Sequence, residues 1–363
     1  MKRANPYSSA PDYRRWSKSV AAKGAAADPL VRWPYQIKRT DRIATAGSCF
    51  AQHIARYLQR SGYNFLQCEP AHPILSPEIA ETFGYTQYSA RFGNIYSARQ
   101  LLQLFQRAFG QFEPEEPVWK SADGRYFDPL RPSIQPRGFA TLAEFNADRR
   151  QHMAAVRKMF EDLDIFVFTL GLTETWVSAI DGTAFPVCPG TVAGEFDPER
   201  HVYLNFSTSD VIADLEAFIA GLRLINPRAR IILSVSPVPL AATAEDRSVL
   251  VSTVYSKSVL RCAAEQVSAL DSVDYFPSYE IITGPQSRGR FFADDLRSVT
   301  EDGVAQVMSV FFRHVAGEPF LERSEPAKAD EFNDTLQAVV DALCDEAALD
   351  AAADAVLQEN NPR

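Results

Sequence analysis

The residue best placed to do chemistry is Ser48, in the run Gly-Ser-Cys-Phe-Ala at 47–51. A β-type stretch ends at the glycine of this run. Apolar residues then recur at helical spacing as far as Leu58, and Gly62 stands where a helix commonly ends. Ser48 is thus predicted at the carboxyl end of a strand and the N-terminus of a helix. In an open α/β sheet ligands bind at this place, and the free N–H groups of the helix N-terminus can hold an oxyanion. A Gly-Ser pair is, however, also typical of a plain turn with a capping serine.

A serine nucleophile needs a neighbouring base to accept its proton. On the predicted helix His53 shares a face with Cys49 rather than with the serine, and it is retained as an alternative base. His152 and His201 are more distant candidates, each expected to be a structural histidine. Lys257 could activate a serine as in Ser-Lys dyads, but a lysine in the middle of a helix is expected at the surface.

The elements that position Ser48 follow a regular alternation of helices and buried strands. An early helix is expected at 97–109. The later predicted helices are 142–163, 210–225, 247–270 and 301–314, and the predicted strands are 164–171, 229–235 and 273–276. This order predicts an α/β fold with a doubly wound, mostly parallel sheet.

The chain divides into three predicted parts. Residues 1–41 form an N-terminal arm, 42–324 form the α/β domain with an irregular insertion at 70–136, and 325–363 form an acidic helical tail. The tail carries ten acidic residues against two basic ones, so most of the net charge of −9 resides there. The nearly neutral remainder does not favour nucleic acid as a partner, and the tail is expected to contact the domain, another protein or a second copy of the chain.

Composition excludes several further classes. No apolar run approaches the length of a membrane span, and the first 42 residues lack the apolar centre of a signal peptide, so a cytoplasmic location is expected. The five cysteines and five histidines show no paired spacing typical of zinc or of a disulfide framework. We therefore expect no metal and no cofactor.

Several blocks of the chain resemble the GSCFA family in the same order. They are Gly47-Ser48-Cys49-Phe50-Ala51, Val235-Ser236-Pro237-Val238-Pro239, Ser256-Lys257, Tyr275-Phe276-Pro277-Ser278-Tyr279-Glu280-Ile281 and Arg290-Phe291-Phe292-Ala293-Asp294-Asp295. That family looks like a branch of the SGNH (GDSL-type) hydrolases. The resemblance implies a three-layer α/β/α sandwich of the flavodoxin-like kind and an esterase, carbohydrate deacetylase or O-acyltransferase activity.

The resemblance also implies roles for single residues. Ser48 matches the nucleophile, and Gly93 matches the glycine of the second block, whose N–H lies in the oxyanion hole. The third block, Gly-x-Asn-Asp in the superfamily, reads Gly171-Leu172-Thr173-Glu174 here. The last block, Asp-x-x-His, begins at Asp295 and ends at Ser298.

Two departures from that pattern weaken the implied mechanism. The side-chain amide of the third block is missing, so Thr173 or Asn94 would have to replace it as an oxyanion donor. Ser298 stands where the histidine is expected, which leaves Asp295 as the surviving acidic partner. Glu174 lies beside Trp176, and a carboxylate next to an aromatic face suits a sugar ring.

These observations favour an SGNH-like enzyme that acts on the O-acyl group of a carbohydrate or glycan through Ser48, by hydrolysis or by acyl transfer. The alternative is a catalytically degenerate protein of the same fold that binds glycans or serves as a scaffold.

Overall fold

The computed structural model describes residues 5–319, and these fall into two compact units. One unit consists of 39–275, and the other combines 5–38 with 276–319. The predicted boundary at 41/42 lies close to the first division, and the structure adds a second one at 275/276. The predicted acidic tail at 325–363 lies outside the described residues.

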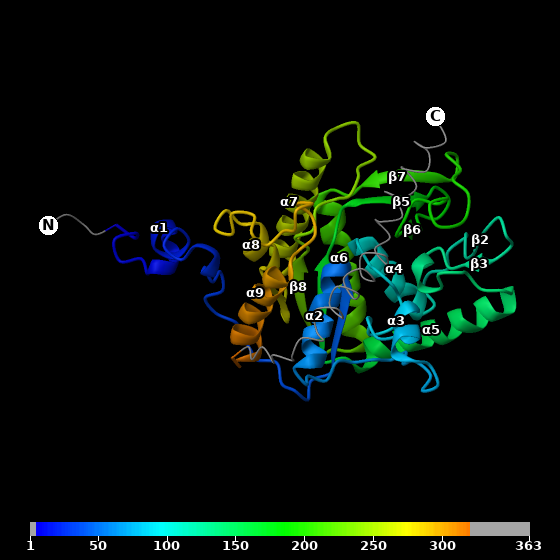
Figure 1. The fold of residues 1–363 in the computed structure, drawn as a ribbon, viewed down its shortest axis with the longest axis horizontal. Helices are drawn as coiled ribbons and strands as arrows, with labels where there is room; N and C mark the ends of the chain where they lie inside the picture. The colour runs from blue at the N-terminus through cyan, green and yellow to red at the C-terminus, as the bar shows by residue number, and fades with distance from the viewer. Residues whose placement is uncertain (1–4, 320–363) are drawn as a thin grey trace. The chain divides into compact units, whose positions relative to one another are not determined.

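A four-stranded parallel sheet forms the centre of the 39–275 unit (Figure 1). Its order is β1-β4-β8-β9, with bounds Ile43–Gly47, Ile165–Leu170, Arg230–Val235 and Val273–Tyr275. Every residue of β1 and β4 is buried, because helices cover both faces and leave no place for the polar alternation of a half-exposed strand. The predicted α/β class with a parallel sheet is confirmed.

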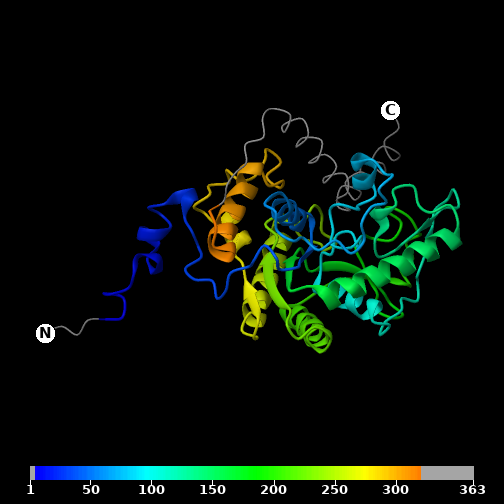
Figure 2. The same cartoon turned by 90° about the horizontal axis from the view of Figure 1, so that it is seen from below.

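Helices flank this sheet on both sides, which covers both of its faces. The helix that follows β1 is α2, Cys49–Arg60. The helices that precede or follow β4 and β8 are α4, Ala98–Ala108, α5, Leu142–Asp162, α6, Thr208–Ile225, and α7, Val249–Val267. Figure 2 shows α2 and α6 on opposite sides of the strands. The result is consistent with a three-layer sandwich.

Local sequence explains where these helices begin and end. Ser97 and Gln100 form a capping box at the start of α4, and Ser207 and Asp210 form another at the start of α6. Gly62, with φ +75°, follows the end of α2. The helices predicted at 97–109, 142–163, 210–225 and 247–270 are therefore confirmed to within a few residues.

Several short elements have no counterpart in the sequence-based prediction. The 70–136 region contains α3, Pro77–Thr82, and a hairpin of β2, Trp119–Lys120, and β3, Tyr126–Phe127. A separate antiparallel sheet of order β6-β5-β7 follows β4, with bounds Ala184–Phe185, Glu174–Ser178 and His201–Asn205. Trp119, Phe127 and Phe185 pack together in one apolar cluster between these pieces.

The unit made of 5–38 and 276–319 contains α1, Trp16–Ser19, α8, Ser278–Thr283, and α9, Glu301–Phe311. Its two chain segments are tied together by specific contacts. The Ile37 N–H donates to Val315 O at 2.9 Å, and Trp33 packs edge-on against Phe276. Asp28 accepts from Arg313 and contacts His314 Nε2 at 2.8 Å. No helix in 5–319 is both long and apolar enough to cross a bilayer.

Candidate functional site

Ser48 sits at the junction of β1 and α2, as the sequence predicts. Gly47 has φ +143°, and a Cβ placed on it would lie 2.4 Å from the Thr169 carbonyl oxygen of β4. Only glycine allows this conformation and this close approach between neighbouring strands. The chain therefore turns sharply at Gly47 and delivers Ser48 to the carboxyl end of the sheet.

The Ser48 hydroxyl is not used to cap the helix it precedes. Ser48 is the N-cap residue of α2, with φ −72° and ψ 179°, yet its side chain makes no capping hydrogen bond. Its Oγ is buried and has no hydrogen-bond partner among residues 5–319. Buried hydroxyls are nearly always bonded, so an unbonded one at this position is a functional candidate.

A small cavity of about 10 Å³ adjoins Ser48. Its lining comes from the carboxyl ends of three neighbouring strands, through Ser48 after β1, Gly171 after β4 and Ser236 after β8, together with Tyr96 and Lys257. A cavity of this size holds about one water molecule. The carboxyl edge of the sheet thus carries a small preformed cavity that combines polar groups with an apolar wall.

Lys257 is buried in this site, contrary to the surface position expected for it. It is only 2% exposed, and its Nζ donates to Gly171 O at 2.5 Å. On α7 it lies three residues before Leu260 and one after Ser256, both buried. The apolar residues at the start of α7, by contrast, are exposed, Leu250 at 70%. Helical spacing from Leu260 was the signal that could have predicted this burial.

The backbone N–H groups around the cavity are engaged within the protein. The Ser48 N–H faces Thr169 O at 3.4 Å, a long contact, and the Gly171 N–H donates to Tyr96 O at 2.9 Å. A Cβ on Gly171 would lie 3.0 Å from that same Tyr96 oxygen, so glycine permits the approach. An oxyanion could take the Gly171 N–H only after the Tyr96 carbonyl moves away, and the Ser48 N–H only by replacing its long contact with Thr169 O.

Gly93 and Asn94 belong to a loop that runs alongside the end of β1. The next residue, Ile95, donates its N–H to Gly47 O at 2.8 Å. Gly93 has φ +72°, and a Cβ placed on it would lie 3.8 Å from the Cβ of Arg131. Asn94 Oδ1 accepts from Gln52 Nε2 at 3.0 Å, and Asn94 lines a second cavity rather than that of Ser48. Their assignment to the oxyanion hole stays a prediction.

Thr173 and Glu174 lie where β5 begins, and their side chains contact other groups. The Thr173 hydroxyl donates to Asn205 Oδ1 at 2.7 Å, and Glu174 Oε1 accepts from Thr243 Oγ1 at 2.7 Å. Burial and the Glu174 carboxylate raise the pKa of Tyr203 on the neighbouring strand. Neither Thr173 nor Glu174 lines the Ser48 cavity.

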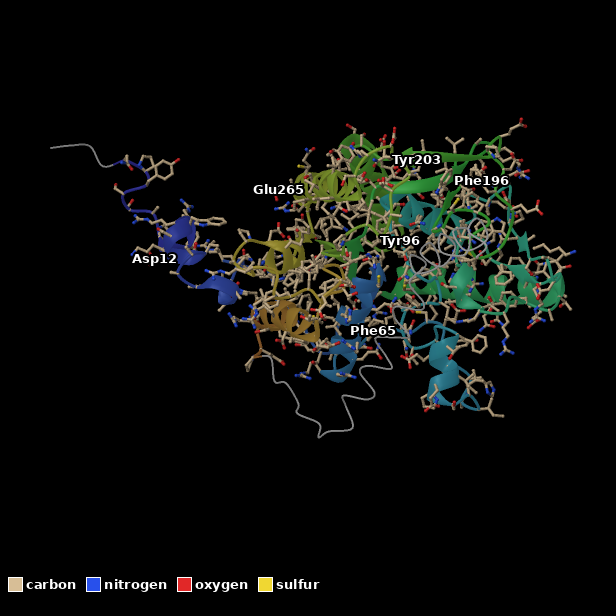
Figure 3. The ribbon with its side chains drawn as sticks, turned by 45° about the horizontal axis from the view of Figure 1, so that its top comes forward. Asp12, Phe65, Tyr96, Phe196, Tyr203 and Glu265 are labelled. Carbon is tan, nitrogen blue, oxygen red and sulfur yellow. The ribbon has the colours of Figure 1, made fainter. Side chains whose placement is uncertain are left out.

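An aromatic cluster lies on the same small sheet. Trp176 packs edge-on against Phe196, with ring centroids 5.1 Å apart, and against Tyr203 at 5.7 Å. Figure 3 labels Phe196 and Tyr203 in this part of the domain. The aromatic surface expected beside Glu174 is therefore present, and Phe196 is 45% exposed on it.

The histidines considered as bases have other contacts. His53 Nδ1 lies 3.0 Å from the Arg56 guanidinium, His152 Nδ1 lies 2.8 Å from Glu69 Oε2, and His201 Nε2 lies 3.1 Å from Glu116 Oε2. None of the three lines the Ser48 cavity. His53 as an alternative base stays a prediction that these contacts do not support.

Asp295 belongs to the unit of 5–38 and 276–319 and is described there alone. Its Oδ1 accepts the N–H groups of Arg297 and Ser298 at 2.9 Å, and its Oδ2 accepts from Ser298 Oγ at 2.5 Å. Burial acts to raise the pKa of Asp295, but these hydrogen bonds from Ser298 and Arg297 outweigh it and lower the pKa. Ser298, in the position of the missing histidine, thus binds the carboxylate directly.

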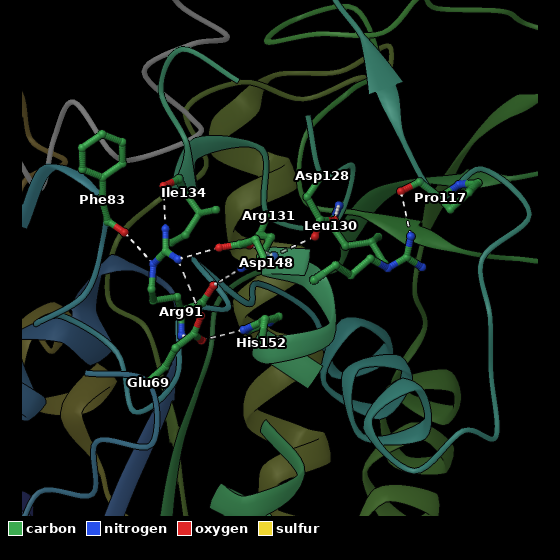
Figure 4. A network of polar contacts seen from close by, with 11 residues as sticks. Glu69, Phe83, Arg91, Pro117, Asp128, Leu130, Arg131, Ile134, Asp148 and His152 are labelled. Atoms are coloured by element: carbon green, nitrogen blue, oxygen red, sulfur yellow. Dashed lines mark hydrogen bonds and ion pairs between the residues drawn. The ribbon is translucent and has the colours of Figure 1, made fainter. Parts of the chain in front are cut away.

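A buried network of charges holds the chain that leads into the 92–96 loop (Figure 4). Arg91 contacts Asp148 at 3.0 Å and donates its backbone N–H to Glu69 at 2.8 Å. Arg131 joins Asp148 to Asp128, and the Asp128 contact is 2.8 Å. Burial acts to raise the pKa of Glu69, but His152, Arg131 and the Arg91 N–H outweigh it and lower the pKa to about 2. All members are ionised or bonded, so the network positions the loop rather than offering a reactive group.

Metal ligation has no visible basis in the described part of the chain, where no group of three or more His, Cys, Asp or Glu side chains is placed to hold an ion. No curated protein matches the chain. The model of the GSCFA family matches residues 42–311, which include β1, Ser48, the Ser48 cavity and α9.

Proposed function

The chain belongs to the GSCFA family, and we propose that it is a serine-dependent enzyme that hydrolyses or transfers an O-acyl group of a carbohydrate or glycan. One observation carries the proposal. The unbonded hydroxyl of Ser48 and the buried amine of Lys257 line the same cavity at the carboxyl edge of the parallel sheet.

Membership of the SGNH superfamily is part of this proposal. Its support is the three-layer architecture and a serine at the first strand-to-helix junction. The superfamily's histidine is absent at Ser298, and Lys257 supplies a chemically suitable replacement, because Ser-Lys pairs perform the same proton transfer elsewhere.

In the proposed mechanism the opening of the site brings Ser48 Oγ, which has no hydrogen-bond partner in this structure, within reach of a neutral Lys257 amine; Ser48 Oγ then attacks the carbonyl carbon of the ester while its proton passes to that amine. The bond from that carbon to the leaving oxygen then breaks, and the leaving oxygen takes the proton from Lys257. Water or a sugar hydroxyl next attacks the acyl-serine, and its proton follows the same route, which regenerates Ser48. Freed N–H groups of Ser48 and Gly171 would stabilise the oxyanion.

The site must open for this reaction. An ester needs more room than the 10 Å³ present, so the wall formed by Tyr96 and by Val238 to Leu240 has to move when substrate binds. The same movement would release the Gly171 N–H from Tyr96 O. The aromatic cluster around Trp176 is the candidate surface for the sugar ring.

The test compares Ser48→Ala, Lys257→Met and Lys257→Arg with the wild type on short-chain acyl esters, with and without sugar acceptors. Arginine keeps a donor for Gly171 O but cannot become neutral, so it separates a base from a structural lysine. We expect Ser48→Ala and both Lys257 variants to lose about 10³-fold or more in kcat/KM. Full activity of Lys257→Arg would remove Lys257 as the base.

Asp295 is the competing partner implied by the superfamily pattern. Asp295→Asn in the same assay distinguishes the two. If Asp295→Asn loses activity while the Lys257 variants stay active, Asp295 rather than Lys257 is the base.

A second candidate function is acylated-glycan binding without turnover. It is favoured by the engaged N–H groups of Ser48 and Gly171 and by the missing histidine. If this function is correct, the wild type should bind an acylated sugar without releasing a product, and Ser48→Ala should bind it with the same affinity.

A further inference from the structure

A second cavity, of about 20 Å³, is also lined by the 92–96 loop but shares no lining residue with the Ser48 cavity. It is lined by Asn94 and Ile95 of that loop, by one face of α4 through Gln100 and Arg107, and by Leu130. No Asp or Glu is among its lining residues. The only full charge on its wall is therefore the positive charge of Arg107.

The guanidinium of Arg107 differs from those of its arginine neighbours because it makes no hydrogen bond or ion pair to another residue of 5–319. Arg91 and Arg131 bind carboxylates, Arg99 binds Asp214 at 2.8 Å, and Arg149 donates to Pro117 O at 3.1 Å. A guanidinium carries five donors, and those of the half-buried Arg107 have no acceptor in the described chain, so they are free to bind solvent or a ligand.

None of the surrounding carboxylates is paired with the Arg107 guanidinium. Burial lowers the pKa of Arg107 to about 10; Asp128 attracts its charge, and Arg149 and Arg131 repel it. Asp128 is already bonded to Arg131 at 2.8 Å (Figure 4). Arg107 therefore stays protonated at neutral pH but has no carboxylate of its own.

Gln100 adds a second donor to the same cavity. Its Oε1 accepts the N–H groups of Tyr96 at 2.8 Å and Ser97 at 3.0 Å, which fixes the amide. Its Nε2 group donates to nothing in the described chain. Gln103, also on the wall, has both amide atoms engaged, with Gly182 O and the Ala184 N–H.

We propose that this cavity is a binding site for the carboxylate group of a small-molecule ligand, held by the Arg107 guanidinium and the Gln100 amide. The site presents donors and lacks free carboxylates, and a planar carboxylate matches the guanidinium fork with two parallel hydrogen bonds. The site is separate from the proposed catalysis at Ser48 and does not depend on it.

The test measures the thermal unfolding midpoint of the whole protein against sodium acetate at constant ionic strength, with phosphate as a parallel titration. Arg107→Met is compared with the wild type and with Arg150→Met, which removes the same charge from the exposed side of α5. Acetate should raise the midpoint of the wild type and of Arg150→Met with the same concentration dependence. Arg107→Met should bind acetate at least about tenfold more weakly.

The stability of Arg107→Met without ligand provides an independent measurement. The Arg107 guanidinium has no bonded partner among the described residues, and the cost of burying its charge outweighs the attraction of Asp128, so its removal should leave the midpoint unchanged or higher. A large loss of stability would show a structural role and overturn the proposal. Equal acetate shifts in all three proteins, or a stronger response to phosphate than to acetate, would also overturn it.

Discussion

At the scale of single residues, the turn at Gly47 determines whether Ser48 can reach the edge of the sheet. Its φ of +143° lies where side chains are essentially excluded, and the Thr169 carbonyl leaves no space for a Cβ. The two penalties act together. Gly47 is therefore more constrained than a glycine that only occupies a turn.

We expect Gly47→Ala to reduce the free energy of unfolding by at least about 3 kcal/mol, through backbone strain and overlap with Thr169. Gly124→Ala is the matched control, because Gly124 has φ +81° and open space around it. That variant should lose only about 1–2 kcal/mol. Urea denaturation of both measures the difference, and similar losses would contradict a steric role for Thr169.

At this scale the predicted placement of Ser48 between a strand and a helix is confirmed, whereas the surface position predicted for Lys257 is wrong, and the difference has a physical reason. The Gly-Ser pair and the spacing that ends at Gly62 are local signals, and local signals determine where a helix starts and stops. The burial of Lys257 depends on α7 packing against the end of β4; helical spacing places Lys257 on the same face as the buried Leu260, but the general preference of lysine for the surface argues against burial. The contacts of Asn94, Thr173 and the histidines depend on tertiary partners in the same way.

At the scale of elements, the charge network of Figure 4 joins α5 to the irregular segments that flank α3 and β3. Burial of five charged groups and a histidine is tolerated because each has a bonded partner. The network explains how a region rich in prolines and poor in regular structure holds the 92–96 loop against β1.

This network makes stability depend on acid pH through Glu69. Its pKa is about 2 in the folded chain against an ordinary value of 4.5, so the unfolded chain takes up a proton first as the pH falls. Its stabilisation is complete above about pH 4.5 and is lost as the pH approaches 2, with a magnitude of up to about 3 kcal/mol.

The measurement is the free energy of unfolding from pH 5 to pH 2 for the wild type and Glu69→Gln. The variant should be less stable at neutral pH and should show a shallower decline in this window. Glu161→Gln, which removes the exposed partner of Arg157, should decline as the wild type does. If the free energy of unfolding of Glu69→Gln fell with pH as steeply as that of the wild type, the acid sensitivity would belong to other carboxylates.

The central elements could be predicted, whereas β5, β6 and β7 could not. Continuous apolar runs such as 164–171 are typical of strands covered on both faces. The β7 strand, His201–Asn205, is short, and its alternating aliphatic residues, Val202 and Leu204, are exposed, so the usual rule that the apolar face is buried does not mark it. Its pairing with β5 depends on contacts made after the main sheet forms.

At the scale of the whole molecule, the unit of 5–38 and 276–319 is built from two distant stretches of chain. Trp33 is central to their contact, because it packs against both Tyr35 and Phe276. Trp16, by comparison, is 63% exposed.

We expect Trp33→Ala to loosen this unit while leaving the 39–275 unit intact. The amide of Ile37, which donates to Val315 O, should lose at least about tenfold of its protection against hydrogen exchange, whereas the amide of Val167 in β4 should not change. Trp16→Ala serves as the control and should affect neither amide. Equal loss of protection at Ile37 in both variants would show that Trp33 is not the anchor.

The two-stretch construction of this unit sets an order of events during synthesis. Residues 5–38 leave the ribosome first but find their partners only after 276–319 have emerged, which at about 5–20 residues per second means a wait of tens of seconds. During that interval the aromatic side chains of the early segment are uncovered, and they are open to chaperones or to neighbouring nascent chains. This stretch is therefore where translation speed and folding yield should be most closely linked.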